Sequence, residues 1–185
     1  MASADGQRLF FALWPDDALR HTLYKETRRA VRASGGKPLP AENFHITLVF
    51  LGHLDAGGAA AARAAADSTF GESFELTLDR LGFWADAHVV WLGPQEVPES
   101  GSRFAADLRE ALRARGIAVE LRAFLPHVTL ARKVSKPGNF GTLRPIRWPV
   151  RKFVLVHSIP NRHASEYRRL ASWPLRAPAA AAAEL

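Results

Sequence analysis

One four-residue pattern occurs twice in this sequence, as His45–Ile46–Thr47–Leu48 and again as His127–Val128–Thr129–Leu130. Chance would produce two such matches in a chain of this composition less than about once in a thousand cases. Successive side chains of a β-strand alternate between its two faces, so the histidine and the threonine of each copy share one face. The opposite face is apolar and is expected to anchor each strand in a core; its residues are Ile46, Leu48 and Phe50 in the first copy, and Val128 and Leu130 in the second.

The two copies end two similar strand–helix–strand units. A strand at Leu9–Leu13 and a helix precede the first copy, and a strand at Val89–Leu92 and another helix precede the second. This internal repeat predicts two lobes related by a pseudo-twofold axis, with a cleft between them that one histidine–threonine strand from each lobe faces. No linker divides the chain, so we expect one bilobal domain over residues 1–176 and a disordered Ala-rich tail over 177–185.

Periodicity and turn residues predict the remaining elements. Helices are expected at Asp16–Ala33, Ala59–Asp67 and Ser102–Arg115, and strands at Arg8–Trp14, Phe44–Leu51, Pro126–Lys133, Val150–Ser158 and Glu166–Ser172. Phe74–Leu81 alternates apolar and polar residues, and we expect it to pair with Ala87–Leu92 as a hairpin. An aspartate at position 16 or 17 is expected to cap the first helix, and Gly35 to end it.

The composition excludes several classes of protein. The chain is 48% hydrophobic and has no cysteine, which excludes a disulfide framework, a thiolate nucleophile and a Cys-based zinc site. No apolar run approaches the ~20 residues of a membrane span, and Met1–Gln7 carries no secretory signal, so we expect a cytoplasmic protein. No apolar surface stripe calls for a partner, and we expect a monomer. The net charge of +7 suits a polyanion, although abundant arginine also occurs without that function.

The residue types that face the predicted cleft restrict its chemistry. Two imidazoles, which titrate near neutral pH, supply one general base and one general acid. Two hydroxyls donate hydrogen bonds to the oxygens of a tetrahedral anion without adding charge. This set suits in-line displacement at a phosphodiester, and the sequence carries no metal-ligand or cofactor motif. Because the two copies are nearly identical, the residues alone leave open which histidine is the acid.

These motifs resemble those of the 2H phosphoesterase superfamily, and most closely its bacterial RNA 2′,3′-cyclic phosphodiesterase branch, also called 2′-5′ RNA ligase. The resemblance extends over nearly the whole chain and rests on both tetrapeptides together with Arg8–Leu13, Asn43–Phe44, Phe50–Gly52, Val89–Gly93, Pro126, Ala131–Arg132, Ser158 and Tyr167. It implies an α+β fold in which antiparallel sheets and helices surround a central cleft. It also implies an enzyme that hydrolyses 2′,3′-cyclic phosphate ends of RNA, with no metal and no cofactor.

The same resemblance implies roles for single residues. His45 is then the acid that protonates the ribose 3′-oxygen, and His127 is the base that activates water, which leaves a 2′-phosphomonoester. Thr47 and Thr129 would bind the phosphate oxygens, and Arg132 would add a charge-assisted contact. The two histidines also permit the reverse reaction, in which a 5′-hydroxyl attacks the cyclic phosphate and forms a 2′-5′ linkage, although water competes strongly.

Other residues are candidates for contacts along the groove. Aromatic rings of the first strand could stack on a nucleobase, and two residues of the late strands could line the groove. The first set is Phe10, Phe11 and Trp14, and the second is Ser158 and Tyr167. The remaining histidines are interpreted as surface or structural residues; they are His21, His53, His88, His157 and His163.

Three alternatives stay open at this point. One is a 2H enzyme that acts on another cyclic or 2′-5′-linked nucleotide. Another is a non-catalytic RNA-binding module. Such a module has no turnover to lose, and replacing either motif histidine with alanine leaves its affinity for RNA unchanged. The third is an adventitious Zn²⁺ site between the two histidines, which would make activity sensitive to a chelator.

Overall fold

The structure is a computed structural model that describes residues 6–135, 138–161 and 166–177. The predicted tail from residue 178 onward and His163 lie outside the described residues. In chain order the described elements are β1 (Gln7–Leu13), α1 (Asp17–Ala33), β2 (Lys37–Pro38), the 3₁₀ helix η1 (Ala41–Asn43), β3 (Ile46–Leu54), α2 (Ala56–Asp67), β4 (Phe74–Leu78), β5 (Arg80–Trp84), β6 (Val89–Gly93), α3 (Glu99–Arg113), β7 (Val128–Arg132), β8 (Ile146–Val150), β9 (Lys152–Ile159) and β10 (Glu166–Pro174).

A large antiparallel sheet runs through the middle of the molecule. Its strands follow the order β10-β9-β1-β3-β7-β6-β5, and the short β2 pairs with β7, while β4 and β8 form a separate two-stranded sheet. A single residue pair, Ile46 of β3 with Val128 of β7, joins the two halves of the large sheet. The molecule is therefore built from two antiparallel halves that meet at the two motif strands, which confirms the α+β class and the two lobes.

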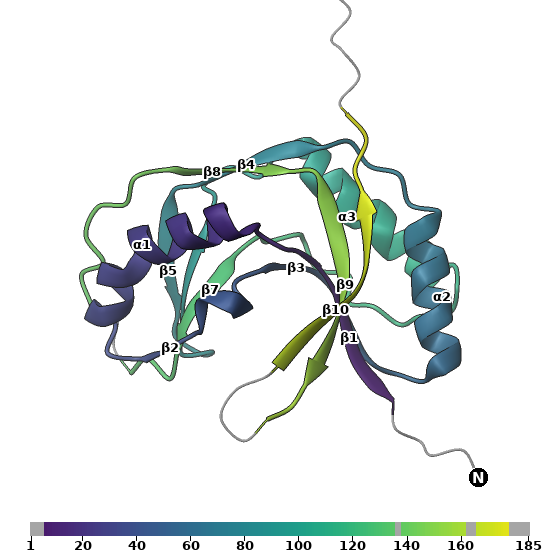
Figure 1. Cartoon of the computed structure of the whole chain (residues 1–185), viewed down its shortest axis with the longest axis horizontal. Helices are drawn as coiled ribbons and strands as arrows, with labels where there is room; N and C mark the ends of the chain where they lie inside the picture. Colours follow the sequence, from purple (N-terminus) through teal and green to yellow (C-terminus); the bar gives the residue numbers. More distant parts are fainter. Residues whose placement is uncertain (1–5, 136–137, 162–165, 178–185) are drawn as a thin grey trace, which may run out of the picture.

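The helices cover the two halves on opposite sides of the molecule. Figure 1 shows α1 on the side of β5 and β7, and α2 and α3 together on the other side. Although α1 follows β1 in the chain, it packs against β7 and β8, and α3 follows β6 but packs against α2 and β3. The helix of each repeat thus crosses to the half that holds the other motif strand, which ties the halves together. None of the described helices is long and apolar enough to cross a membrane.

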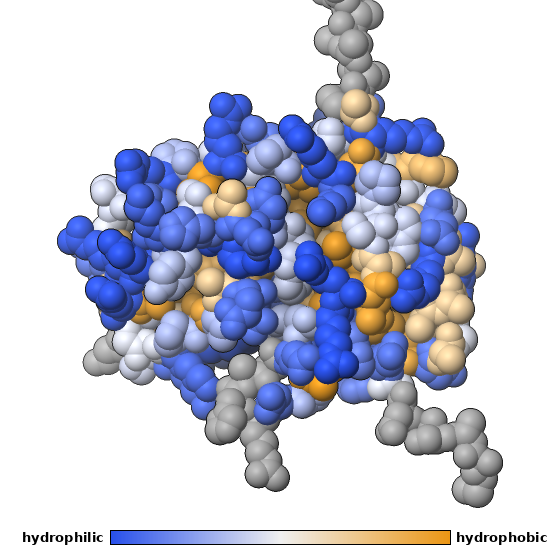
Figure 2. Space-filling view, viewed as in Figure 1, coloured by the Kyte–Doolittle hydropathy of each residue, from blue (hydrophilic) through white to orange (hydrophobic). Residues whose placement is uncertain are grey.

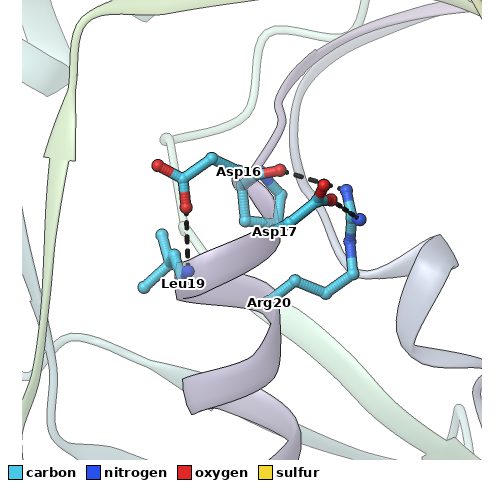
Figure 3. A network of polar contacts seen from close by, with 5 residues as sticks. Asp16, Asp17, Leu19 and Arg20 are labelled. Carbon is cyan, nitrogen blue, oxygen red and sulfur yellow. Dashed lines mark hydrogen bonds and ion pairs between the residues drawn. The ribbon is translucent and has the colours of Figure 1, made fainter.

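The first helix begins and ends as its sequence predicts. Asp16 is the N-cap, and its carboxylate accepts a hydrogen bond of 2.8 Å from the backbone N–H of Leu19 (Figure 3). Arg20 pairs with Asp17 one turn away and also donates to a backbone carbonyl (Figure 3). Gly35, with φ of +61°, follows the helix. Hydrophilic side chains gather over the outer surface of α1 (Figure 2), in keeping with its many exposed arginines.

The predicted hairpin of Phe74–Leu81 with Ala87–Leu92 is wrong in its pairing. The first part of that segment, β4, pairs with β8, whereas β6 pairs with β5. The chain changes sheets at Asp79, whose carboxylate accepts from the backbone N–H of Gln95 at 2.8 Å. Alternation of apolar residues shows that a strand is half-buried but not which strand lies beside it. The predicted strand Val150–Ser158 corresponds to β9, except that Val150 is the last residue of β8.

A β-bulge in β3 changes which side chains face the core. Ala12 of β1 pairs with Thr47, and the next residue, Phe11, pairs with Val49, so Leu48 is an extra residue on β3. An extra residue reverses the alternation of side chains beyond it, because the period of a strand is two.

The bulge explains why Phe50 does not anchor the core, as the sequence predicts. Val49 and Leu51 are buried instead, and Phe50 is 61% exposed. Its ring lies 6.0 Å from that of Phe10, which belongs to a small aromatic and aliphatic cluster separate from the main core. The other predicted anchors, Ile46, Leu48, Val128 and Leu130, are all buried, as expected.

Candidate active site

The two motifs meet at the centre of the large sheet. Ile46 and Val128, which pair across β3 and β7, are the residues between histidine and threonine in the two copies. A local twofold axis of this antiparallel pair therefore relates His45 to His127 and Thr47 to Thr129. In this register His45 lies opposite Thr129, and Thr47 lies opposite His127. All four residues are partly exposed, so one face of two adjacent strands presents two imidazoles and two hydroxyls.

Each imidazole is oriented by the same backbone contact. Nδ1 of His45 lies 2.7 Å from the carbonyl oxygen of Asn43, and Nδ1 of His127 lies 2.8 Å from that of Leu125. A carbonyl only accepts, so Nδ1 carries the hydrogen and donates in both cases. This tautomer leaves Nε2 of each ring free to accept or to donate a proton. The twofold relation of the motifs thus extends to the residues two positions before each histidine.

Charge and burial act together on the two histidines. Burial is the largest influence on His45 and lowers its pKa from 6.5 to about 4; the hydrogen bond to Asn43 opposes the shift, and the charges of His127 and Arg132 add to it. The pKa of His127 is also lowered, first by burial and then by Arg132, against the hydrogen bond to Leu125. Since both pKa values are lowered from 6.5, both imidazoles are neutral at pH 7 in the absence of a bound anion, and the charge of Arg132 contributes to both shifts.

Aromatic rings account for the burial of His45. The indole of Trp14 stacks on the imidazole with ring centroids 5.4 Å apart and an angle of 4° between the planes. Phe10 and Tyr167 lie at 5.1 Å from the imidazole, and Tyr167 meets it edge-on. Tyr167 therefore lies beside His45, and Phe10 and Trp14 form the wall of the site around this imidazole.

A tryptophan that the sequence analysis missed packs against His127. Trp84 of β5 meets the imidazole edge-on with centroids 4.4 Å apart, and Trp91 lies 5.2 Å from Trp84. Trp91 fits because Gly82 faces it; a Cβ atom at Gly82 would lie 2.1 Å from the indole. The sequence gives no signal for this contact, because the predicted strand Phe74–Leu81 ends before Trp84, whereas in the structure β5 extends to Trp84 and pairs with β6.

The remaining candidates divide between the site and the core. Arg132 is exposed at the end of β7. Ser158 pairs with Tyr167 across β9 and β10 but is only 3% exposed. The prediction that Phe11 contacts a base is wrong: Phe11 is 0% exposed and packs between Phe153 and Trp173. Alternation along β1 turns Phe11 into the main core and its neighbour Phe10 toward His45.

The groups gathered at the site suit transfer at phosphorus. Two imidazoles with free Nε2 atoms, two hydroxyls and one guanidinium can move protons and bind anionic oxygens. Among residues 6–135, 138–161 and 166–177, no three His, Asp or Glu side chains lie together as candidate metal ligands.

Comparison with known proteins agrees with this geometry. Residues 15–159 match the 2'-5' RNA ligase superfamily. The chain is 32% identical to a protein of Escherichia coli named RNA 2',3'-cyclic phosphodiesterase, over 93% of this chain and 98% of that protein. It is 30% identical to a protein of the same name from Thermus thermophilus, over 91% and 90% of the two chains. A crystal structure of Escherichia coli LigT in apo form, at 32% identity, superposes with a TM-score of 0.82 over 93% of this chain and 99% of that one. The chain therefore belongs to the 2'-5' RNA ligase superfamily.

Proposed function

We propose that the protein is an RNA 2′,3′-cyclic phosphodiesterase that opens the cyclic phosphate at an RNA terminus to a 2′-phosphomonoester. The observation that carries the proposal is the meeting of two histidine–threonine motifs on adjacent strands, with both Nδ1–H groups bound to backbone carbonyls. The relatives from Escherichia coli and Thermus thermophilus bear the name of this activity.

The reaction needs one proton acceptor and one proton donor. His127 takes a proton at Nε2 from water as the water oxygen bonds to phosphorus. The bond from phosphorus to the 3′-oxygen breaks in line with this attack, and His45 gives the proton on its Nε2 to that oxygen. The two imidazoles end with their protonation states exchanged, and solvent restores them after the product leaves.

The low pKa of His45 fits a donor that is charged only when substrate is present. Without a bound anion this imidazole is neutral at pH 7, since its pKa is about 4. The negative phosphate favours the imidazolium when it binds, so the proton arrives together with the substrate. In the complex the pKa of His45 is therefore raised from this low value, and the imidazolium gives its proton to the departing ribose oxygen.

The other groups of the site bind the phosphate. The hydroxyls of Thr47 and Thr129 donate to its non-bridging oxygens, and Arg132 supplies a positive charge. The reaction as written needs no metal ion. The same groups catalyse the reverse attack by an RNA 5′-hydroxyl, which forms a 2′-5′ linkage, but hydrolysis dominates unless two RNA ends are held together. Tyr167 lies beside the terminal nucleotide, edge-on to His45, whereas Ser158 is buried behind it and does not touch the nucleotide.

Localisation and oligomeric state are part of the same proposal. It places the protein in the cytoplasm, where RNA termini are available, and as a monomer. Few large apolar side chains of the described residues are exposed, which supports the monomer; they are Tyr24 on α1, Phe50 on β3, Phe70 in the loop after α2, and Leu121 and Leu125 in the loop before β7. Light scattering of the purified protein tests this, and a stable dimer at micromolar concentration would contradict it.

The test of the function uses an RNA oligonucleotide that ends in a 2′,3′-cyclic phosphate. Wild-type protein in EDTA is expected to convert this end to a 2′-phosphate, whereas His45→Ala and His127→Ala are expected to lose most of the rate. Conversion that stops in EDTA would overturn the metal-free mechanism and favour a Zn²⁺ site. RNA binding without conversion would favour a binding module. Turnover of another cyclic or 2′-5′-linked nucleotide alone would favour a different 2H substrate.

A further inference from the structure

A cavity at the end of β7 is lined in part by Arg132, which also belongs to the candidate active site. The charge of Arg132 acts on both imidazoles, and its side chain also borders this cavity of about 490 Å³. The described residues that line this cavity are Ala87, His88, Arg132, Lys133, Val134 and Ser135. The reaction at the two motif histidines gives no role to this cavity.

The cavity is framed by two residues in strained backbone conformations. His88 and Lys133 have φ of +52° and +58°, and among the described residues these are the two with positive φ that are not glycine. Such conformations cost energy in bulky residues and persist only where the surroundings hold them.

Two hydrogen bonds hold the strained residues in place. The backbone N–H of Val134 donates to the carbonyl oxygen of His88 at 3.1 Å, and Nδ1–H of His88 donates to the carbonyl oxygen of Val134 at 3.0 Å. They fasten the turn between β5 and β6 to the chain that leaves β7. The second bond also fixes the tautomer of His88 and leaves its Nε2 free, as in the two motif histidines.

The lining of the cavity favours an anion. Arg132 and Lys133 are both exposed cations, and no aspartate or glutamate is among the described lining residues. A guanidinium and an ammonium around a fixed cavity bind phosphate oxygens by charge-assisted hydrogen bonds. Arg132 lines this cavity, and it follows the second motif on β7, three residues after Thr129. A ligand that spans the cavity and the two motif histidines therefore carries two phosphates.

We propose that this cavity binds the phosphate on the 5′-oxygen of the terminal nucleotide while the cyclic phosphate lies between His45 and His127. This proposal rests on the proposed function, since it takes the position of the cyclic phosphate from it. In an RNA chain the bound group is the last phosphodiester. The cavity thus makes the protein prefer RNA ends to free nucleoside 2′,3′-cyclic phosphates, which lack that phosphate.

The test compares three substrates that differ only at the 5′-oxygen. They are a nucleoside 2′,3′-cyclic phosphate, the same compound with a 5′-phosphate, and a dinucleotide that ends in it. Lys133→Gln is the main variant, and Lys152→Gln, which removes an exposed lysine at the start of β9, is the matched control. His88→Asn is the second variant, because asparagine tolerates positive φ.

Lys133→Gln is expected to raise KM about three- to fivefold for both substrates with a 5′-phosphate and to leave the unphosphorylated nucleoside within twofold. The slope of log kcat/KM against log salt for the dinucleotide should become shallower, because one cation no longer meets the bound phosphate. His88→Asn should show the same selectivity, and Lys152→Gln should match wild type on all three substrates. Equal effects on all three substrates, or none on the dinucleotide, would overturn the proposal.

Failure of the proposed function would look different. Wild-type protein would then turn over none of the three substrates. Calorimetric binding of a dinucleotide 3′-phosphate still tests the cavity in that case. A Kd raised about three- to fivefold by Lys133→Gln and unchanged by Lys152→Gln supports the phosphate site, and an unchanged Kd in both variants refutes it.

Discussion

Acidification is expected to destabilise the free protein through His45. Burial lowers the pKa of this imidazole from 6.5 to about 4. Between these values the unfolded chain is protonated and the folded chain is not, so stability is fully present above pH 6.5 and falls as the pH approaches 4. At 1.36 kcal/mol per pKa unit the full loss is about 3 kcal/mol, and about 2 kcal/mol of it has occurred at pH 5.

Urea unfolding of wild type and His45→Gln at pH 7.5 and pH 5.0 measures this contribution. Glutamine does not titrate, so the loss of unfolding free energy between the two pH values should be smaller in His45→Gln by about 2 kcal/mol. His21→Gln, which removes an exposed imidazole from α1, is the control for the loss of a histidine. An equal pH dependence in wild type and His45→Gln would refute the claim that burial keeps this imidazole neutral.

Two substitutions test the packing at Gly82 and the cap of α1, and a pH profile tests the charge on His45. Gly82→Ala should lower the unfolding free energy by about 1–3 kcal/mol in thermal unfolding, because its Cβ would overlap Trp91, and unchanged stability would contradict that packing. Asp16→Ala should cost about 1 kcal/mol through the lost cap of α1, and a midpoint equal to wild type in urea would refute the cap. In pH–rate profiles, kcat should fall on the alkaline side at a higher pH than kcat/KM does, because bound phosphate raises the pKa of His45. If both profiles fall at the same pH, substrate leaves this pKa unchanged.

The chemistry-bearing residues were predictable because they follow local rules. Alternation along a strand sets His45 and Thr47 on one face, and the internal repeat does the same for His127 and Thr129. The structure adds that the two strands are direct neighbours. Capping rules likewise predicted the start of α1 at Asp16.

Other features depend on contacts that a single strand does not encode. The bulge at Leu48 arises from the register of β3 against β1, and beyond it Phe50 is exposed while Val49 and Leu51 are buried. The choice of β8 rather than β6 as the partner of β4 depends on which apolar faces fit together. Trp84 reaches His127 only because β5 and β7 flank β6 in one sheet, so no spacing in the sequence connects the two residues.

The central claim is that the two motif histidines act as one acid–base pair on a single phosphodiester. A cycle of His45→Ala, His127→Ala and the double variant, assayed on RNA with a 2′,3′-cyclic phosphate end, measures this directly. Groups that act as a unit are strongly non-additive, so each single variant should lose about 10²–10⁴-fold in kcat and the double variant should be hardly slower than either. A double variant slowed by the product of the two single losses, or a single variant with nearly full rate, would contradict the claim.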